Sequence, residues 1–143
     1  MEYMWIIYAL ISAVAASLVA IFGKIGLQGI DTNTATAIRA VIMAIFLVGV
    51  IVVLGKLNDI KPILMNSKAL TFIILSGIAG AVSWLFYFVA LKNAEVSQIV
   101  PIDRMSVVFA LLLAFFILGE KISLKAGIGA ALVVVGGILI ALG

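Results

Sequence analysis

The chain has 143 residues, of which 66% are hydrophobic and 10% are charged, and its net charge is +3. Soluble domains average about 45–50% apolar and about 25% charged residues, and a domain of this length cannot bury so much apolar surface. The composition therefore excludes a water-soluble fold and indicates an integral membrane protein in contact with the lipid bilayer.

Two residue types are missing, since the sequence contains no cysteine and no histidine. Their absence excludes disulfides, thiolate nucleophiles, zinc sites with Cys or His ligands, and histidine-based proton relays. No nucleophile–base pair or metal cluster is visible, so we expect no enzyme, no catalytic residue, no metal and no cofactor. The small positive charge, confined to loops, does not favour nucleic acid as a partner.

The first predicted helix spans about residues 4–22 and is rich in small residues. Residues 13–15, Ala-Val-Ala, resemble a signal-peptide cleavage site. A signal peptide begins with positive charge, whereas Glu2 is the sole charged residue before Trp5 and the apolar run continues to Phe22. We therefore expect a retained membrane helix rather than a cleaved leader.

The second predicted helix spans about residues 33–54, after N-cap residues of suitable type at positions 31–33. Thr32, Thr36 and Arg39 share one face of it by their spacing, and Arg39 lies about 9 Å into the helix. The polar segment 55–68 then reads as a solvated loop with a short interfacial turn through Leu57, Ile60 and Leu64.

The third predicted helix spans about residues 69–91, and its second half is aromatic. The aromatic run favours either an interfacial belt or the wall of a substrate cavity, and both interpretations stay open. In the second case Ser83, Trp84 and Tyr87 hold an amphipathic or aromatic small-molecule solute. Ser76 and Gly80 form a pair of small residues suited to close helix packing.

The fourth predicted helix, residues 96–118, carries an Asp-Arg pair near its start. Ionisable groups within a span cost at least ~2.5–3.5 kcal/mol each on insertion scales, so they face a protein interior or a wet cavity. Asp103 and Arg104, with Ser106 on the face of Asp103, are therefore candidates for a substrate or ion pathway. Arg39 and Asp103 lie at similar depth, and we expect them to pair, either as a structural neutralisation or as part of transport.

Pro101 lies just before this charged pair and frees the carbonyl of Ser97, four residues back. If the helix begins at Val96, Pro101 is a kink that exposes backbone near Asp103; if Pro101 lies in the first turn, it is only a helix start. Kinked helices beside charged groups point to binding sites in transporters. Pro101 is therefore our candidate kink.

The fifth predicted helix, residues 123–142, contains four glycines that we expect to serve close helix packing rather than a hinge: Gly127, Gly129, Gly136 and Gly137. The chain thus predicts an all-α integral membrane protein, a bundle of five transmembrane helices over residues 4–142. We expect no strands, because irregular backbone is not tolerated against lipid and no barrel alternation is present.

Positive residues divide weakly between the two membrane faces. The positive-inside rule favours a cytoplasmic N-terminus, but a bias of five against four leaves dual insertion open. The face of the N-terminus carries Lys56, Lys61, Lys68, Lys121 and Lys125, and the other carries Lys24, Lys92, Arg39 and Arg104.

Several segments, in this order, resemble the EamA domain of the drug/metabolite transporter superfamily. They are Ile21–Gly26 with Ala35–Arg39, Trp84–Leu91, Ala94, Pro101-Ile102, Val107–Ala110, Leu118-Gly-Glu-Lys121, and Gly127 with Gly136-Gly137. The Leu-Gly-Glu-Lys turn before the last helix is the best single marker. The resemblance covers nearly the whole chain and provides no universal catalytic residue to carry over.

The resemblance implies an ATP-independent secondary transporter that moves a small metabolite, amino acid or drug across the cytoplasmic membrane. Most members carry two such domains as inverted repeats, ten helices in all, whereas this sequence holds one. Its Asp103-Arg104 pair also departs from the commonest pattern and resembles the short single-domain branch. Five spans reverse the orientation of whatever follows them, so a single half needs a second chain. We expect a homodimer, antiparallel if insertion is dual, or a heterodimer with a related chain.

Other functions stay open at this point. The small multidrug resistance family resembles this chain in size and pairing, but its members have four helices and an essential Glu in the first, where this chain has no acid. A subunit of a lipid-linked sugar flippase belongs to the same superfamily. A non-transporting membrane assembly protein is the alternative from a different class.

Overall fold

The computed structural model describes residues 3–143, and within them it contains helices and no strand. Five apolar helical segments are long enough to cross a membrane. The predicted fold class, an all-helical membrane protein with five spans, is therefore confirmed. The spans are α1 (Met4–Gly26), α2 (Thr32–Val53), α4 (Ser67–Asn93), the interrupted helix Val96–Leu118 and α7 (Leu124–Leu142).

α1 and α4 both end later than the sequence predicts, and a lysine in the last turn of each helix donates a hydrogen bond to a carbonyl outside that helix. α1 continues about one turn past Phe22, and Lys24 in its last turn donates from Nζ to the carbonyl of Ala94 at 2.7 Å. α4 ends at Asn93, and Lys92 in its last turn donates to the carbonyl of Ile30 at 3.0 Å. Each lysine satisfies a backbone carbonyl outside its own helix.

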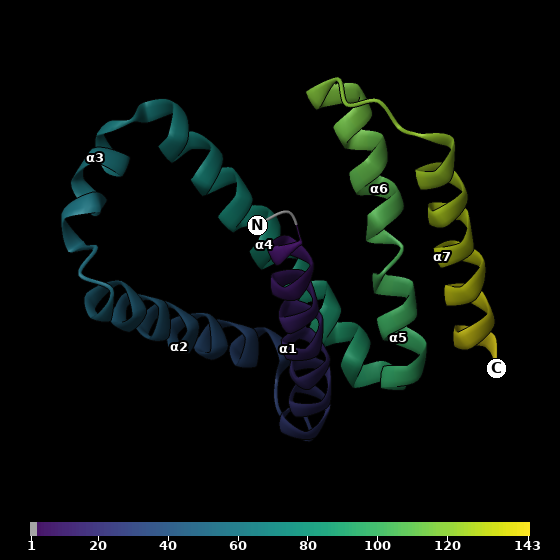
Figure 1. Ribbon diagram of the computed structural model, residues 1–143. Helices are drawn as coiled ribbons and strands as arrows, with labels where there is room; N and C mark the ends of the chain where they lie inside the picture. The colour runs from purple at the N-terminus through teal and green to yellow at the C-terminus, as the bar shows by residue number, and fades with distance from the viewer. Residues whose placement is uncertain (1–2) are drawn as a thin grey trace. The chain divides into compact units, whose positions relative to one another are not determined.

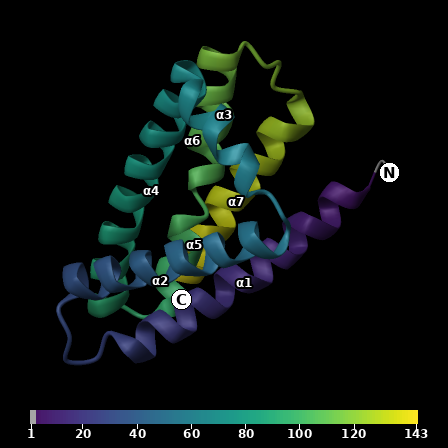
Figure 2. The same ribbon diagram turned by 90° about the vertical axis from the view of Figure 1, so that its left-hand side faces the viewer.

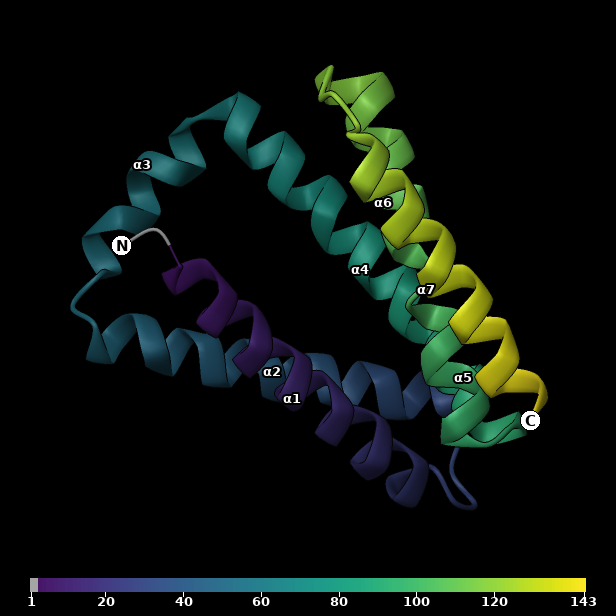
Figure 3. The ribbon, with the colours of Figure 1, turned by 45° about the vertical axis from the view of Figure 1, so that its right-hand side comes forward.

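The chain divides into two compact units, one made of α1 up to Ile25 with Asn93–Gly143, the other made of Gly26–Lys92. In the first unit the fourth span packs alongside α7 (Figure 1, green and yellow). Figure 3 shows the same pairing from another side. The two helices approach each other at Gly137, where an added Cβ would sit 3.0 Å from the backbone oxygen of Pro101.

The fourth span is not one continuous α-helix. It consists of α5 (Val96–Asp103), α6 (Ser106–Leu113) and a short π-helical segment, η2 (Ala114–Leu118). α5 begins at Val96, so Pro101 lies in its second turn. Around the break at Arg104 and Met105, hydrogen bonds reach back three residues, as from Met105 N–H to the Ile102 carbonyl at 3.0 Å. This tighter pattern interrupts the helix directly after Asp103.

The glycines of α7 differ in their surroundings. Close packing is confirmed at Gly137, which is buried against α5. A Cβ added at Gly127, Gly129 or Gly136 would meet nothing within 4 Å. Within this chain, therefore, one of the four glycines serves helix packing, and the other three leave room at the surface of α7.

The second unit consists of α2, a 3-10 turn η1 (Leu57–Asp59), α3 (Ile60–Met65) and α4. The short turn predicted in the 55–68 segment thus exists as η1 and α3. Figures 1 and 2 both show α2 and α4 close together where α2 begins and α4 ends, and far apart at α3. The two helices therefore diverge instead of packing along their length.

Apolar side chains point outward along all five spans. In each span only 6% of an apolar stretch of 18 residues is buried. Lipid or a second subunit must cover these apolar faces, because their exposure to water is unfavourable. Among residues 3–143 the buried ones are few: Ala20, Leu27, Thr32, Thr36, Phe88, Leu91, Ile99 and Gly137.

Asp31 caps α2, as its residue type predicts. Its carboxylate accepts from both the backbone N–H and the hydroxyl of Thr34, at 2.8 Å each. The backbone hydrogen bond, then the hydroxyl, with a smaller contribution from the Lys92 charge, lowers the pKa of Asp31 below its ordinary value of 3.8. A carboxylate with a lowered folded-state pKa stabilises the fold above pH 3.8, and this contribution is lost as the pH falls through the folded-state pKa.

We expect Asp31→Ala to lower the melting temperature at neutral pH, because α2 loses its cap. Asp31→Asn keeps a capping oxygen but no titrating group, so wild type and Asp31→Asn should differ at pH 7 and converge below pH 3.8. Thermal unfolding of the detergent-solubilised protein, followed by circular dichroism between pH 3 and 7, measures both effects. A constant difference over that range would contradict the assignment.

Candidate functional site

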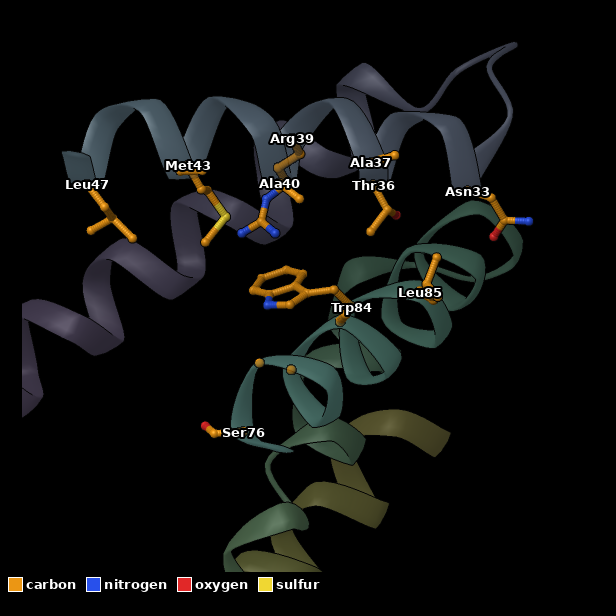
Figure 4. Close-up of a pocket in the computed structure, with 14 residues that line it drawn as sticks. Asn33, Thr36, Ala37, Arg39, Ala40, Met43, Leu47, Ser76, Trp84 and Leu85 are labelled. Atoms are coloured by element: carbon orange, nitrogen blue, oxygen red, sulfur yellow. The ribbon is translucent and has the colours of Figure 1, made fainter. Parts of the chain in front are cut away.

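The second unit contains a cleft of about 540 Å³ between α2 and α4. We call it the α2–α4 cleft, and Figure 4 shows residues of both helices pointing into it. Its volume falls within the range of about 300–1,000 Å³ typical of small-molecule sites. It is lined by Asn33, Thr36, Ala37, Arg39, Ala40, Met43, Ala44 and Leu47 from α2 and by Ser76, Gly77, Gly80, Ala81, Trp84 and Leu85 from α4.

The lining follows directly from helical spacing. On α2 the lining positions recur every three or four residues, which places them on one helix face. Both faces carry small side chains, among them Ala40, Ala44, Gly77 and Gly80. A Cβ added at either glycine would meet nothing within 4 Å. The small residues therefore create space rather than close packing.

The central feature of the cleft is a cation stacked on an aromatic ring. The guanidinium carbon of Arg39 lies 3.6 Å from the centroid of the Trp84 ring and 5.5 Å from that of Phe88. Figure 4 shows Arg39 reaching from α2 over the indole of Trp84, which comes from α4. Tyr87 and Phe88 meet the Trp84 ring edge-on at centroid distances of 5.5 and 5.6 Å. These ring contacts hold the indole in place beneath the guanidinium.

The contact with Trp84 offsets part of the free-energy cost of a charge at this position. Arg39 lies seven residues beyond the start of α2, about 10 Å along the helix axis. A charge inside a span costs at least ~2.5–3.5 kcal/mol on insertion scales. A guanidinium on an indole face recovers about 0.5–1 kcal/mol at exposed sites and about 2 kcal/mol when desolvated, and Arg39 is partly buried. The part of this cost that the Trp84 contact does not recover favours an additional, negatively charged partner near Arg39.

No acid of the second unit provides that partner. The carboxylates of Gly26–Lys92, all of which the structure describes, belong to Asp31 and Asp59. Asp31 is engaged in capping α2, and Asp59 lies in η1, beyond the other end of the helix. The cleft lining contains no acidic residue and one charged residue, Arg39. The site is therefore an apolar cleft with a single positive charge.

The structure brings together only some of the predicted site residues. Arg39 and Trp84 line the cleft, and Tyr87 contacts Trp84 at its ring edge. Ser83 is exposed and does not belong to the lining. The sequence reasoning missed Met43 and Leu47, which a helical-wheel projection from Arg39 and Thr36 would have placed on the same side of α2.

The second group of predicted residues lies in the first unit. Asp103 ends α5, Arg104 lies in the break, and Ser106 starts α6; all three are exposed. The predicted pairing of Arg39 with Asp103 would join the two units and stays a prediction, as does any role of Asp103, Arg104 and Ser106 in transport. Their place at an interrupted helix is one that transporters use for solute or ion sites.

Comparison with known proteins fixes the class of this membrane protein. The family model of the EamA-like transporter family matches residues 3–142. The chain belongs to this family. A Sinorhizobium sp. protein named "Uncharacterized transporter in cobO 3'region" is 34% identical over 141 residues, covering 99% of each chain. No solved structure matches the chain. The resemblance inferred from the sequence is confirmed, and this EamA-like protein is a multi-pass membrane transporter.

Proposed function

We propose that the protein is a secondary transporter that moves a small metabolite, amino acid or drug across the cytoplasmic membrane without ATP. The observation that carries this proposal is the α2–α4 cleft, which is of ligand size and has one cation on an aromatic platform. A charged group at membrane depth is a functional-site candidate by default. Family membership supports transport, and the cleft supports a solute site within the second unit.

We further propose that the working form is an antiparallel homodimer. Each span leaves its apolar face almost fully exposed, which suits coverage by a second subunit. The relative from Sinorhizobium sp. matches over 99% of its own length, so its length is that of a single five-span domain. Inverted halves around a shared pathway are the usual plan of secondary transporters.

The transport activity is tested with purified protein in proteoliposomes. The liposomes are offered four labelled, membrane-impermeant solutes: an organic anion, a zwitterionic amino acid, an organic cation and a neutral sugar. We expect uptake of at least one, driven by an imposed proton, sodium or solute gradient and absent from protein-free liposomes. No flux of any of them, with the dimer intact, would favour a non-transporting assembly role.

Dual insertion predicts a specific labelling result. Asn58 is exposed in η1, and the sequence has no native cysteine, so Asn58→Cys can be labelled against a silent background. We expect a membrane-impermeant thiol reagent to label about half of the molecules in intact cells. Full labelling only after permeabilisation would mean one fixed orientation with a cytoplasmic N-terminus. The partner would then be an oppositely oriented related chain.

A further inference from the structure

We propose that the α2–α4 cleft recognises an organic anion, a carboxylate attached to an apolar body, through the N–H groups of Arg39 while Trp84 supports the guanidinium from below. The proposal deepens the proposed transport function and rests on it, since it takes the cleft as the solute site. It specifies the charge and the character of the solute.

The hydrogen-bonding capacity of Arg39 is the first argument. A guanidinium has five N–H donors in its plane and no acceptor. The guanidinium carbon lies over the Trp84 ring at 3.6 Å from its centroid, and an indole ring has no carboxylate or carbonyl oxygen to accept a conventional hydrogen bond from these donors. Within Gly26–Lys92, no hydrogen bond or ion pair engages Arg39. A carboxylate matches the fork of donors with two parallel hydrogen bonds.

The direction of Arg39 is the second argument. Figure 4 shows its guanidinium between the two helices, with Met43 and Leu47 on the same side of α2. An anion entering the cleft therefore meets the donors, while apolar walls receive the rest of the molecule. Charge-assisted hydrogen bonds in such surroundings are stronger than in water.

The composition of the lining favours an anion over other charge types. A cationic solute would meet the Arg39 charge and find no acidic side chain in the lining. A zwitterion would leave its ammonium without a carboxylate partner in the cleft, which is costly in apolar surroundings. A neutral apolar solute would leave the donors of Arg39 unused. An anion with an apolar body satisfies both parts of the site.

Trp84 itself provides the test, because the chain contains two tryptophans, Trp5 and Trp84. In a Trp5→Phe background of the full chain, Trp84 is the single indole and lies against the group that would bind the anion. The purified protein in detergent is titrated at neutral pH with hexanoate and, separately, with hexanamide, its neutral counterpart of matched shape. Neither probe absorbs at the excitation wavelength of tryptophan. The Trp84→Phe variant, in which Trp5 reports, corrects for partition into the micelle.

We expect a saturable change of Trp84 emission with hexanoate, and binding at least tenfold weaker for hexanamide. Adding Arg39→Gln should weaken hexanoate binding at least tenfold at unchanged helicity and elution volume. Equal affinity for the amide, unchanged affinity in Arg39→Gln, or no saturable response to hexanoate would overturn the proposal. The comparison of acid and amide uses one folded protein, so it decides the matter even if Arg39→Gln fails to fold.

The proteoliposome panel separates this inference from the proposed function. Flux of a sugar or an organic cation without hexanoate binding would overturn the anion site and leave transport standing. Specific hexanoate binding without flux of any solute would keep the anion site and overturn transport. Flux of the organic anion, inhibited by hexanoate and not by hexanamide, would support both.

Discussion

Replacing Trp84 with leucine is expected to reduce transport about tenfold in the proteoliposome assay, for whichever solute the wild-type protein moves. Leucine keeps an apolar side chain on α4 but removes the ring on which the Arg39 guanidinium lies at 3.6 Å. A desolvated cation–π contact of about 2 kcal/mol corresponds to about thirtyfold, and we expect less because Arg39 is only partly buried. The Arg39 side chain then loses its fixed position in the cleft.

The type of kinetic change distinguishes this role from a structural one. If Trp84 positions Arg39 for binding, the loss should appear mainly as a raised KM. Trp84→Phe keeps a weaker π face and should lie between leucine and wild type. Trp5→Phe, at an exposed position of α1, is the matched control and should leave transport unchanged. Transport within twofold of wild type in Trp84→Leu would contradict the role of the ring.

The number and approximate limits of the spans could be predicted because bilayer thickness fixes the length of an apolar helix. The N-cap of α2 was also predictable, since an Asp before an apolar run satisfies the free N–H groups of the first turn, as Asp31 does with Thr34. Such features depend on a few neighbouring residues. They need no knowledge of how helices pack.

The contacts of Arg39 depend on the arrangement of helices, which the sequence does not provide. The sequence argument selected Asp103 because it carries the opposite charge at a similar depth. That pairing stays a prediction, and within the second unit Arg39 contacts the ring of Trp84, which the sequence argument did not propose. A usable signal was present: α2 begins and α4 ends at the same face, so Arg39 and Trp84 lie at comparable depth on consecutive spans.

The role of the small residues was likewise not fixed by their type. Ser76 and Gly80 were expected to allow close packing, but they line a cleft because α2 and α4 diverge toward α3. In α7 the same residue type behaves differently, since a Cβ added at Gly137 would lie 3.0 Å from the backbone oxygen of Pro101, while a Cβ added at the neighbouring Gly136 would meet nothing within 4 Å. A glycine leaves space beside its helix, and only the packing shows whether a neighbouring helix occupies that space.

That difference between two adjacent glycines yields the prediction with the largest effect on stability. A side chain at Gly137 would bring its Cβ to 3.0 Å from the carbonyl oxygen of Pro101, a backbone atom in α5. Backbone cannot rotate away as a side chain does, so α5 and α7 must separate. Overpacking of this kind costs about 1–3 kcal/mol. We therefore expect Gly137→Val to lower the free energy of unfolding by about that amount.

Gly136→Val is the matched control, because valine carries the same helix-propensity term at both positions and Gly136 has open space around it. The difference between the two variants, measured by unfolding of the detergent-solubilised protein with increasing SDS, isolates the contact between α5 and α7. Pro101→Ala should not rescue Gly137→Val, since the nearest atom is the backbone oxygen and not the proline ring. Equal stabilities of Gly137→Val and Gly136→Val would mean that α5 and α7 do not approach at this glycine.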